Sequence, residues 1–278
     1  MGGVEHIFDK YLRQDKLPQM WCPGCGNGIV LQAIIRAVDE LGLEQDKVVV
    51  VAGVGCSGRA NGYTDFCGVH TNHGRALAYA TGIKMQKPEL NVIVVTGDGD
   101  CTSIGGNHFI HACRRNIDLT AVVFNNSNYG MTGGQYSPTT PDGVYTKTTV
   151  YGNIDPAFDI CDLARGSGAT FVARSTAYHA VQLKNEIARG IGHKGFSVVE
   201  AMCDCPSLYG RINRLGTPAD MISRWKDVCV QRKQADKMSA GELRGKIVIG
   251  EFVNSDARPE YTRMYAALRE RAARGETV

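Results

Sequence analysis

The sequence of 278 residues predicts an α/β fold in which helices flank a parallel sheet. Three observations predict it: apolar runs rich in valine and isoleucine, helical patterns that alternate with these runs, and glycines where the runs end. Strands buried on both faces of a parallel sheet have continuous apolar runs of this kind. Because ligands of such sheets bind at the carboxyl ends of the strands, the segments that follow each run are the first places to search for function.

The first helix and the first strand show the two patterns. Residues 26–42 are predicted to be helical, with Gly42 as a stop signal. One face of this helix carries apolar residues at helical spacing, namely Ile29, Ala33, Ala37 and Leu41. Residues 47–56, KVVVVAGVGC, form a β-branched run that ends in glycine, which predicts a buried parallel strand.

The same alternation continues as far as residue 202. Further helices are predicted over 73–86, 104–116, 159–168 and 177–191. Further strands are predicted over 91–100, 118–126, 170–174 and 196–202. Between them, residues 127–157 are rich in Gly, Pro and Thr and lack apolar periodicity, which predicts a long functional loop.

The sequence predicts a single domain over residues 1–278. The alternation weakens beyond residue 205, and charged residues become frequent. Residues 206–278 are therefore expected to form a peripheral C-terminal extension that ends in a helix.

Charge and composition exclude several classes of function. The net charge is +3 and no basic tail stands out, so no nucleic-acid partner is expected. No apolar run approaches the ~20 residues that cross a membrane. The N-terminal residues 1–16 are charged and lack the apolar core of a secretory signal. We expect a cytoplasmic protein whose ten cysteines are reduced thiols.

Polar residues follow two neighbouring strands of the predicted sheet. Asp98 lies in the GDG sequence at the end of the strand over 91–100, and Asn126 follows the next strand along the chain. Because the carboxyl ends of parallel strands meet at one edge of a sheet, these side chains are expected to lie close together. Their oxygens suit Mg²⁺, and the glycines leave room for a diphosphate. Taken singly, each motif is equally typical of an ordinary turn.

The sequence HTNHGRALAYATG, at 70–82, opens a predicted helix near the same edge. It places His70, His73 and Arg75 close to the predicted site. Arginine and a helix N-terminus both suit phosphate. The alternative is a polar helix cap, which is the preferred interpretation for His70.

Four cysteines from three segments are also expected at this edge. Cys22 and Cys25 precede the first helix, Cys56 follows the first strand, and Cys205 follows the last one. Cys203 competes with Cys205 for the fourth place. Cys67 lies in a loop near Cys56. Core or surface thiols are expected at the other positions, Cys101, Cys113, Cys161 and Cys229.

Three kinds of site compete for the C-x-x-C pair. A zinc site usually adds a second such pair at short range, and none is present. A redox pair of the thioredoxin type lies between a strand and a helix, whereas no strand is evident before Trp21. Four scattered thiolates suit an iron–sulfur cluster, which is favoured over zinc.

The chain resembles, over about residues 18–215, the β subunit of a 2-oxoacid:ferredoxin oxidoreductase. The resemblance rests on six motifs in order: CPGCG, GVGCSGR, HTNHGRALAYATG, GDGD, FNNSNYGMTGGQYSPTTP and CDCPSLYGR. It implies a thiamine diphosphate-binding fold with thiamine diphosphate, Mg²⁺ and one 4Fe–4S cluster. The implied cluster ligands are Cys22, Cys25, Cys56 and Cys205. The implied Mg²⁺ ligands are Asp98, Asn126 and the main-chain carbonyl of Asn128.

The resemblance also implies which residues surround the cofactor. They are Gly55, Ser57, His73, Gly74, Gly97, Asp98, Gly99, Asp100, Asn126, Asn128, Gly130, Met131 and Thr132. The expected catalytic residues are His73, Arg59 and Lys147, the last two as cations that meet a substrate carboxylate. Cys205 is preferred to Cys203 as a ligand because Ser207 follows it at the spacing common in the family.

The implied activity is the coenzyme A-dependent oxidative decarboxylation of a 2-oxoacid to an acyl-CoA and CO₂, or the reverse carboxylation. Electrons would pass through the cluster to ferredoxin. The motif YGMTGGQYSPTTP favours the 2-oxoglutarate branch, with pyruvate and branched-chain 2-oxoacids as alternatives. An α subunit and further small subunits are the expected partners. The glutamate that activates the cofactor comes from a partner in this family, so the chain alone is expected to be inactive.

Two other functions share part of these features. A non-redox thiamine diphosphate decarboxylase or synthase would have no use for four converging cysteines. An electron carrier that holds only a cluster would not need Asp98 and Asn126.

Overall fold

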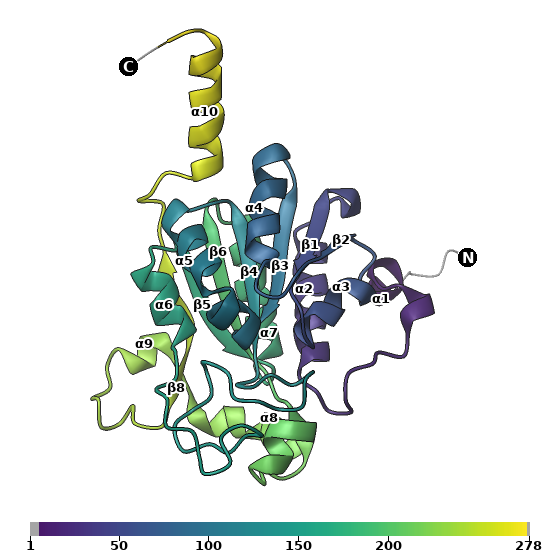
Figure 1. Cartoon of the computed structure of the whole chain (residues 1–278), viewed down its shortest axis with the longest axis vertical. Coiled ribbons are helices and arrows are strands. Elements are labelled where there is room, and N and C mark those ends of the chain that lie inside the picture. The colour runs from purple at the N-terminus through teal and green to yellow at the C-terminus, as the bar shows by residue number, and fades with distance from the viewer. Residues whose placement is uncertain (1–5, 277–278) are drawn as a thin grey trace.

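The computed structural model of the protein describes residues 6–276, in which an eight-stranded sheet has helices on both faces (Figure 1). The strand order is β2-β1-β3-β4-β6-β5-β8-β7. The strands are β1 (Val48–Ala52), β2 (Cys67–His70), β3 (Asn91–Gly97), β4 (Leu119–Asn125), β5 (Phe171–Thr176), β6 (Phe196–Met202), β7 (Cys229–Gln231) and β8 (Ile247–Asn254). The six strands from β2 to β5 in this order run parallel, which confirms the predicted α/β class.

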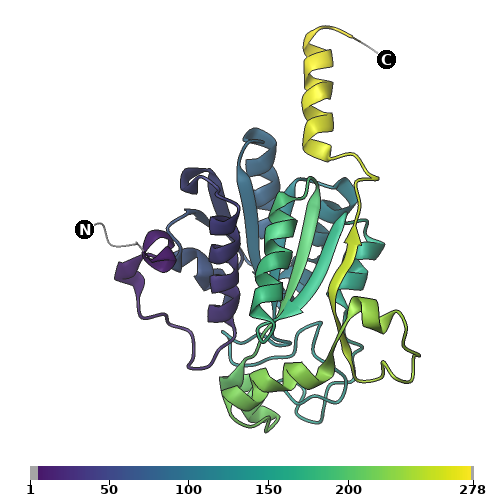
Figure 2. The same ribbon diagram turned by 180° about the vertical axis from the view of Figure 1, so that it is seen from behind.

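Helices cover the two faces in separate groups. One face packs against α2 (Asn27–Glu40) and α7 (Ala180–Gly192), seen from behind in Figure 2. The other packs against α4 (Ala76–Gln86), α5 (Gly106–Arg115) and α6 (Ile160–Gly166). The shorter helices are α1 (Ile7–Tyr11), α3 (Ala60–Tyr63) and α9 (Arg232–Ala235), and α8 (Pro218–Val228) and α10 (Tyr261–Ala273) lie in the C-terminal part.

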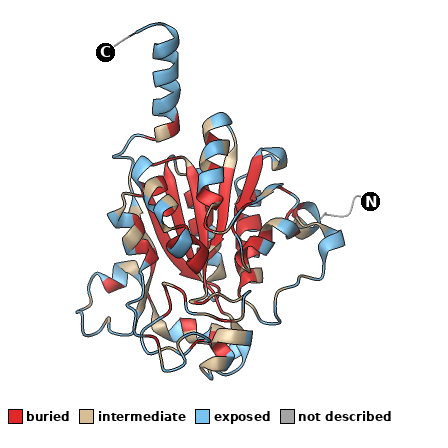
Figure 3. Cartoon of the chain, viewed as in Figure 1, coloured by how far each residue is buried: buried red, intermediate tan, exposed pale blue. Residues whose placement is uncertain are grey.

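Alternating side chains of each central strand feed two hydrophobic cores. In β1, Val48 and Val50 face the core under α2 and α7, whereas Val49 and Val51 face the core under α4 and α5. Figure 3 shows the resulting buried sheet between its helical layers. A fully buried valine contributes ~1.5–3 kcal/mol relative to an exposed one. Burial on both faces therefore explains the continuous valine runs of the sequence.

The register of the sheet brings the polar strand ends together. Gly97, the last residue of β3, pairs with Phe124 near the end of β4. The segments that begin at Asp98 and Asn126 therefore leave the sheet side by side. Both continue into irregular or tightly wound chain, a π-helical turn over Asp100–Ile104 in the first case and the long loop in the second.

Three strands, β2, β7 and β8, are absent from the sequence predictions, and the shortest, β7, pairs with β8 at the edge of the sheet opposite β2. Strand β2 is an edge strand whose residues are mostly exposed, so it carries no apolar pattern. Strand β8 pairs antiparallel with β5 and extends the sheet beyond the predicted last strand over 196–202. Residues 206–278 are therefore not peripheral throughout, because β8 belongs to the sheet itself.

The helix predicted over 73–86 begins at Ala76, because Gly74 adopts a left-handed turn with φ of 70°. The terminal helix α10 is present and projects away from the sheet (Figure 1). None of the helices among residues 6–276 is long and apolar enough to cross a membrane. The first five and last two residues of the sequence, including part of the N-terminal segment considered above, lie outside the described residues.

Candidate functional site

A cavity of about 200 Å³ lies at the carboxyl ends of β1, β3 and β4. It occupies the position at which parallel α/β sheets bind ligands. With the exception of Gly74, all the predicted cofactor residues line it: Gly55, Ser57, His73, Gly97, Asp98, Gly99, Asp100, Asn126, Asn128, Gly130, Met131 and Thr132. The cavity thus collects residues from four separate sequence motifs.

Asp98 is the buried acid of this cavity, with 2% of its surface exposed. Its Oδ2 accepts hydrogen bonds from Ser137 Oγ at 2.5 Å and from Thr139 Oγ1 at 2.7 Å, both in the long loop. Burial raises the pKa of Asp98 to about 6, although these two hydroxyls act in the opposite direction. A cation bound beside the carboxylate would offset this cost of burying its charge.

Two amide oxygens beside Asp98 are buried without a partner. Asn126 Oδ1 and Asn128 Oδ1 form no hydrogen bond within residues 6–276. A buried polar atom of this kind costs about 1–3 kcal/mol unless something satisfies it. A carboxylate and amide oxygens together form the donor set that a hard cation such as Mg²⁺ requires. The residues present therefore fit a magnesium ion.

Asp100 is the second acid in the lining of the cavity. Its Oδ1 lies 2.5 Å from His73 Nδ1 and accepts a hydrogen bond from the Gly74 N–H at 2.7 Å. Its Oδ2 accepts a hydrogen bond from Thr96 Oγ1 at 2.6 Å. Although Asp100 lines the cavity, its carboxylate is engaged by the protein, where it orients the His73 ring. Gly74 lies outside the cavity and serves the same network.

Tyr129 also lines the cavity, although it is not among the residues predicted to surround the cofactor. Its hydroxyl donates to the carbonyl of Gly99 at 3.1 Å, and its ring packs edge-on against His73. A β-carbon at Gly99 would lie 2.4 Å from that ring, so only glycine fits there. The other unpredicted lining residues are Asn27, Val54 and Phe124. No motif in the sequence marks these three residues, whereas the hydroxyl-rich SPTT at 137–140 offered a signal for Ser137 and Thr139.

The four predicted cluster cysteines lie near one another. Burial raises the pKa of the Cys25 thiol to about 12, and the neighbouring Cys205, Cys56 and Cys22 contribute to this shift. A β-carbon at Gly130 would lie 3.5 Å from Cys56 Sγ and 3.6 Å from Cys205 Sγ. Because Gly130 also lines the cavity, these cysteines lie directly beside the cofactor cavity.

Cys203 faces a different environment from Cys205. Cys203 is 3% exposed, packs in the core under α2, and donates from Sγ to Asn27 Oδ1 at 3.5 Å. Cys205 is partly exposed, and its sulfur accepts from Asn128 Nδ2 at 3.8 Å, on the cavity side. The geometry favours Cys205 as the fourth ligand.

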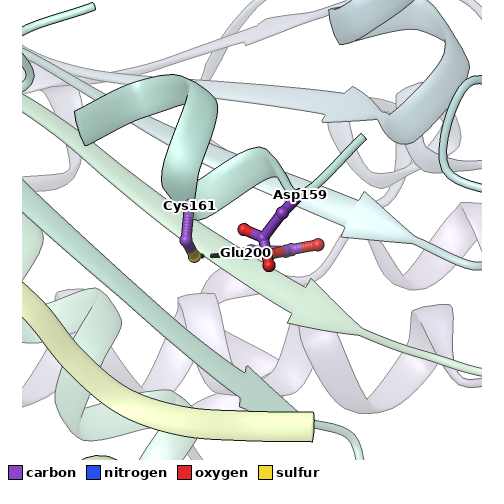
Figure 4. Close-up of side chains that lie close together, drawn as sticks. All are labelled: Asp159, Cys161 and Glu200. Carbon is purple, nitrogen blue, oxygen red and sulfur yellow. Dashed lines mark hydrogen bonds between the residues drawn. The ribbon is translucent and has the colours of Figure 1, made fainter. Parts of the chain in front are cut away.

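The spacing of the four thiols does not suit a single zinc ion. Thiolates that share one zinc at about 2.3 Å lie within about 4.6 Å of one another. Within residues 6–276, only Asp159, Cys161 and Glu200 form a group of at least three ligand atoms as close as 4.8 Å (Figure 4). The four thiols are therefore too far apart to share one zinc ion.

The two predicted substrate cations lie in different places. Arg59 is exposed and lines a second cavity of about 580 Å³, which shares Val54, Gly55 and Met131 with the first. Lys147 is exposed on the long loop, and its N–H donates to the carbonyl of Gly134. Of the two, only Arg59 lines a cavity that adjoins the cofactor cavity.

Comparison with known proteins gives the context of this site. A family model described as "Thiamine pyrophosphate enzyme, C-terminal TPP binding domain" matches residues 48–201. Thiamine pyrophosphate is another name for thiamine diphosphate. The match spans β1 to β6 and contains Asp98 and Asn126.

Two similar proteins carry the name 2-oxoglutarate synthase subunit KorB. The one from Archaeoglobus fulgidus is 53% identical over 97% of this chain and 97% of that protein. The one from Methanothermobacter marburgensis is 46% identical over 100% of this chain and 98% of that protein.

A solved structure shares the fold over nearly the whole chain. It is the 2-oxoglutarate:ferredoxin oxidoreductase from Magnetococcus marinus with 2-oxoglutarate, coenzyme A and succinyl-CoA bound. The TM-score is 0.85 and the identity 32%, over 98% of this chain and 92% of that one. The chain therefore belongs to the thiamine diphosphate-binding β subunits of the 2-oxoacid:ferredoxin oxidoreductases.

Proposed function

We propose that this chain, together with partner subunits, acts on 2-oxoglutarate, with coenzyme A as acyl acceptor and ferredoxin as electron acceptor, in the cytoplasm. The observation that carries the redox part is that the thiols adjoin the cofactor cavity: Cys56 lines it, and so does Gly130, which lies next to the sulfurs of Cys56 and Cys205. The relatives named above support 2-oxoglutarate as substrate, with pyruvate and branched-chain 2-oxoacids as the alternatives.

Each cofactor has a set of residues that fits it. Asp98, Asn126 and the main-chain carbonyl of Asn128 would hold Mg²⁺, and the unsatisfied Oδ1 of Asn126 supports this proposal. The ligands of one 4Fe–4S cluster would be Cys22, Cys25, Cys56 and Cys205. When bound, the thiazolium ring supplies an electron sink for decarboxylation, and the cluster carries single electrons.

The chain's own groups bind and orient around this centre. Asp100 holds His73 by its Nδ1, which turns the other ring nitrogen of His73 toward the cavity that it lines. We propose that His73 contacts the cofactor or the substrate in this way. The ring of Tyr129 packs against His73 and fixes the second side of the imidazole.

Arg59 is the cation best placed to receive a substrate carboxylate. It lines the cavity that shares Val54, Gly55 and Met131 with the cofactor cavity, whereas Lys147 lines neither cavity. A hydrogen bond to a charged group contributes about 1.5–3 kcal/mol, so Arg59→Ala should lower kcat/KM for 2-oxoglutarate about tenfold or more. Lys147→Ala serves as the comparison. Unchanged specificity constants for 2-oxoglutarate and pyruvate in both variants would remove these roles.

A partner subunit must complete the site. Among residues 6–276, no glutamate lines the cofactor cavity, although activation of thiamine diphosphate requires one at its aminopyrimidine ring. The long loop beside the cavity exposes large apolar side chains, with Tyr151 and Ile154 96% and 89% exposed. We propose that an α subunit docks on this loop and supplies the glutamate, with further small subunits in the complex.

The test is co-purification from the native source under anaerobic conditions, followed by assay of 2-oxoacid-dependent dye reduction with coenzyme A. We expect a brown, iron-containing complex that reduces the dye with 2-oxoglutarate. A colourless, iron-free preparation would instead indicate a non-redox decarboxylase or synthase. A brown preparation that releases no thiamine diphosphate on denaturation would indicate a simple electron carrier.

A further inference from the structure

A buried ion pair joins strands β5 and β6, and β6 lies next to β4, whose carboxyl end borders the cofactor cavity. Arg174 in β5 and Glu200 in β6 are 7% and 2% exposed. Arg174 Nε donates to Glu200 Oε2 at 2.6 Å, and Arg174 Nη2 donates to Asp159 Oδ1 at 2.7 Å. Figure 4 shows both carboxylates beside Cys161, as in a metal site. The guanidinium already occupies the position that a cation would take.

Stability alone does not account for this pair. Replacing a buried ion pair by apolar side chains of similar size is often neutral or stabilising. The β6 segment around Glu200, FSVVEAM, is otherwise suited to an apolar core. The presence of a buried glutamate at position 200 therefore needs a reason other than stability. The hydrogen bond that its other oxygen, Oε1, accepts provides one.

Glu200 determines which way the Asn125 amide points. Asn125 Nδ2 donates to Glu200 Oε1 at 2.7 Å. An ionised carboxylate only accepts hydrogen bonds, so the amide nitrogen of Asn125 must face it and the amide oxygen must face away. That oxygen accepts from the backbone N–H of Ser127 at 3.0 Å. Thr139 Oγ1, which donates to Asp98, lies 3.1 Å away from it.

The hydrogen bond between the Asn125 side chain and the Ser127 N–H closes a turn that has Asn126 at its centre. An asparagine that accepts from the N–H two residues later forms a tight side-chain turn. Ser127 lies in the left-handed region, with φ of 57°, which this turn helps to maintain. The turn leaves Asn126 Oδ1 buried, without a partner, at the cavity.

We infer that Glu200, fixed by Arg174, is a positioning residue for the cation site: it sets the orientation of Asn125, whose turn presents Asn126 to Mg²⁺. The inference rests on the proposed magnesium and diphosphate site. The ion pair thereby contributes to the affinity for the cofactor, although neither Glu200 nor Arg174 lines the cavity.

Glu200→Gln tests the inference. A glutamine amide can donate as well as accept, so it no longer forces the Asn125 amide into one orientation. Loss of a partner outside the ligand shell typically lowers metal affinity by about 10–100-fold. In the full complex depleted of both cofactors, we expect the Mg²⁺ concentration that half-saturates thiamine diphosphate binding to rise about tenfold or more. Calorimetric titration measures this without catalytic turnover.

Glu186→Gln is the matched control. Glu186 is also a buried glutamate, 6% exposed and paired with an arginine, Arg189, but it lies in α7 outside the cavity. The same chemical change there should leave Mg²⁺-dependent binding at the wild-type value. Thermal unfolding of both variants without cofactor separates a loss of stability from a loss of affinity.

Asn125→Ala provides the second test, because it removes the link but keeps the ion pair. If the effect of Glu200 passes through Asn125, Glu200→Gln should produce no further loss of Mg²⁺ affinity in the Asn125→Ala background. Additive losses, or wild-type affinity in either single variant, would overturn the inference. A wild-type complex that binds no Mg²⁺ and thiamine diphosphate would overturn the proposed function instead.

Discussion

At the scale of single residues, Cys203 and Cys205 show how two positions in the chain separate a core thiol from a ligand. The backbone N–H of Cys203 still bonds to Asn125, so Cys203 continues the sheet and its side chain enters the core. Cys205 stands at the start of a tightly wound turn over Pro206–Gly210, outside the sheet. The chain has left the strand by then, which frees the Cys205 thiol to face Asn128.

This difference predicts opposite results for two serine variants. Cys205→Ser should lose most of its iron and its brown colour, because one cluster corner is left without a thiolate. Cys203→Ser should retain both, at the cost of placing a more polar group in the core. Iron content and visible absorbance of anaerobically purified protein measure the outcome. Retention of full iron by Cys205→Ser, with loss in Cys203→Ser, would reverse the assignment.

Glu186 predicts a pH effect on stability. Burial raises its pKa above the ordinary value of 4.5, Glu251 adds to the shift, and Arg189 opposes it. A carboxyl with a higher pKa in the folded state stabilises the fold below the unfolded pKa, and this contribution is lost as pH rises through the folded value. The melting temperature of Glu186→Gln relative to wild type should therefore rise between about pH 4 and about pH 7. A difference that stays constant or falls would contradict this.

At the scale of elements, the long loop between β4 and α6 both contacts Asp98 and presents an exposed apolar surface. Ser137 and Thr139 point inward to Asp98, whereas Tyr151 and Ile154 face solvent. The first half of this loop therefore holds Asp98 by hydrogen bonds, and its second half exposes an apolar surface. Anything that binds the outer surface acts on the same loop that holds Asp98.

The outer surface of the loop predicts a defect in assembly. Replacing Tyr151 and Ile154 by lysine should reduce recovery of partner subunits in co-purification, because charges would enter an apolar interface. The fold should be unaffected, since both side chains are exposed. Val181→Lys, at a 75% exposed position on α7, is the control and should leave recovery unchanged. Equal recovery from all variants would place the interface elsewhere.

Elements differ in how far their sequences reveal them. The central strands are buried on both faces, so their valine runs predict them directly. Strand β2 is short and exposed, and β8 lies in a charged region, so neither stands out by composition. The site shows the same division: the motifs locate Asp98 and the four cysteines, but not the tertiary bonds that commit Asp100 to His73. Those bonds depend on the turn at Gly74, which no periodicity reports.

At the scale of the whole molecule, this chain folds around the cofactor edge without closing it. The cavity opens toward Arg59 on one side and toward the long loop on the other. The sheet and both helical layers are complete without a partner, because β1 to β6 and their flanking helices bury two full cores. Folding and catalysis are therefore separable properties of this subunit.

That separation predicts the behaviour of the isolated chain. Expressed alone and reconstituted anaerobically, it should bind iron and Mg²⁺-dependent thiamine diphosphate, yet show no 2-oxoacid-dependent dye reduction. Addition of the partner subunits should restore activity if one of them supplies the activating glutamate, as proposed above. Activity of the chain by itself would show that it contains every catalytic group.

The exposure of Cys22 has a consequence for the lifetime of the protein in air. Cys25, Cys56 and Cys205 are partly covered, but Cys22 stands at the surface. A cluster held by these four thiols would have one corner in reach of dissolved dioxygen. The subunit should therefore bleach in air faster by itself than in the assembled enzyme, if a neighbour covers that corner.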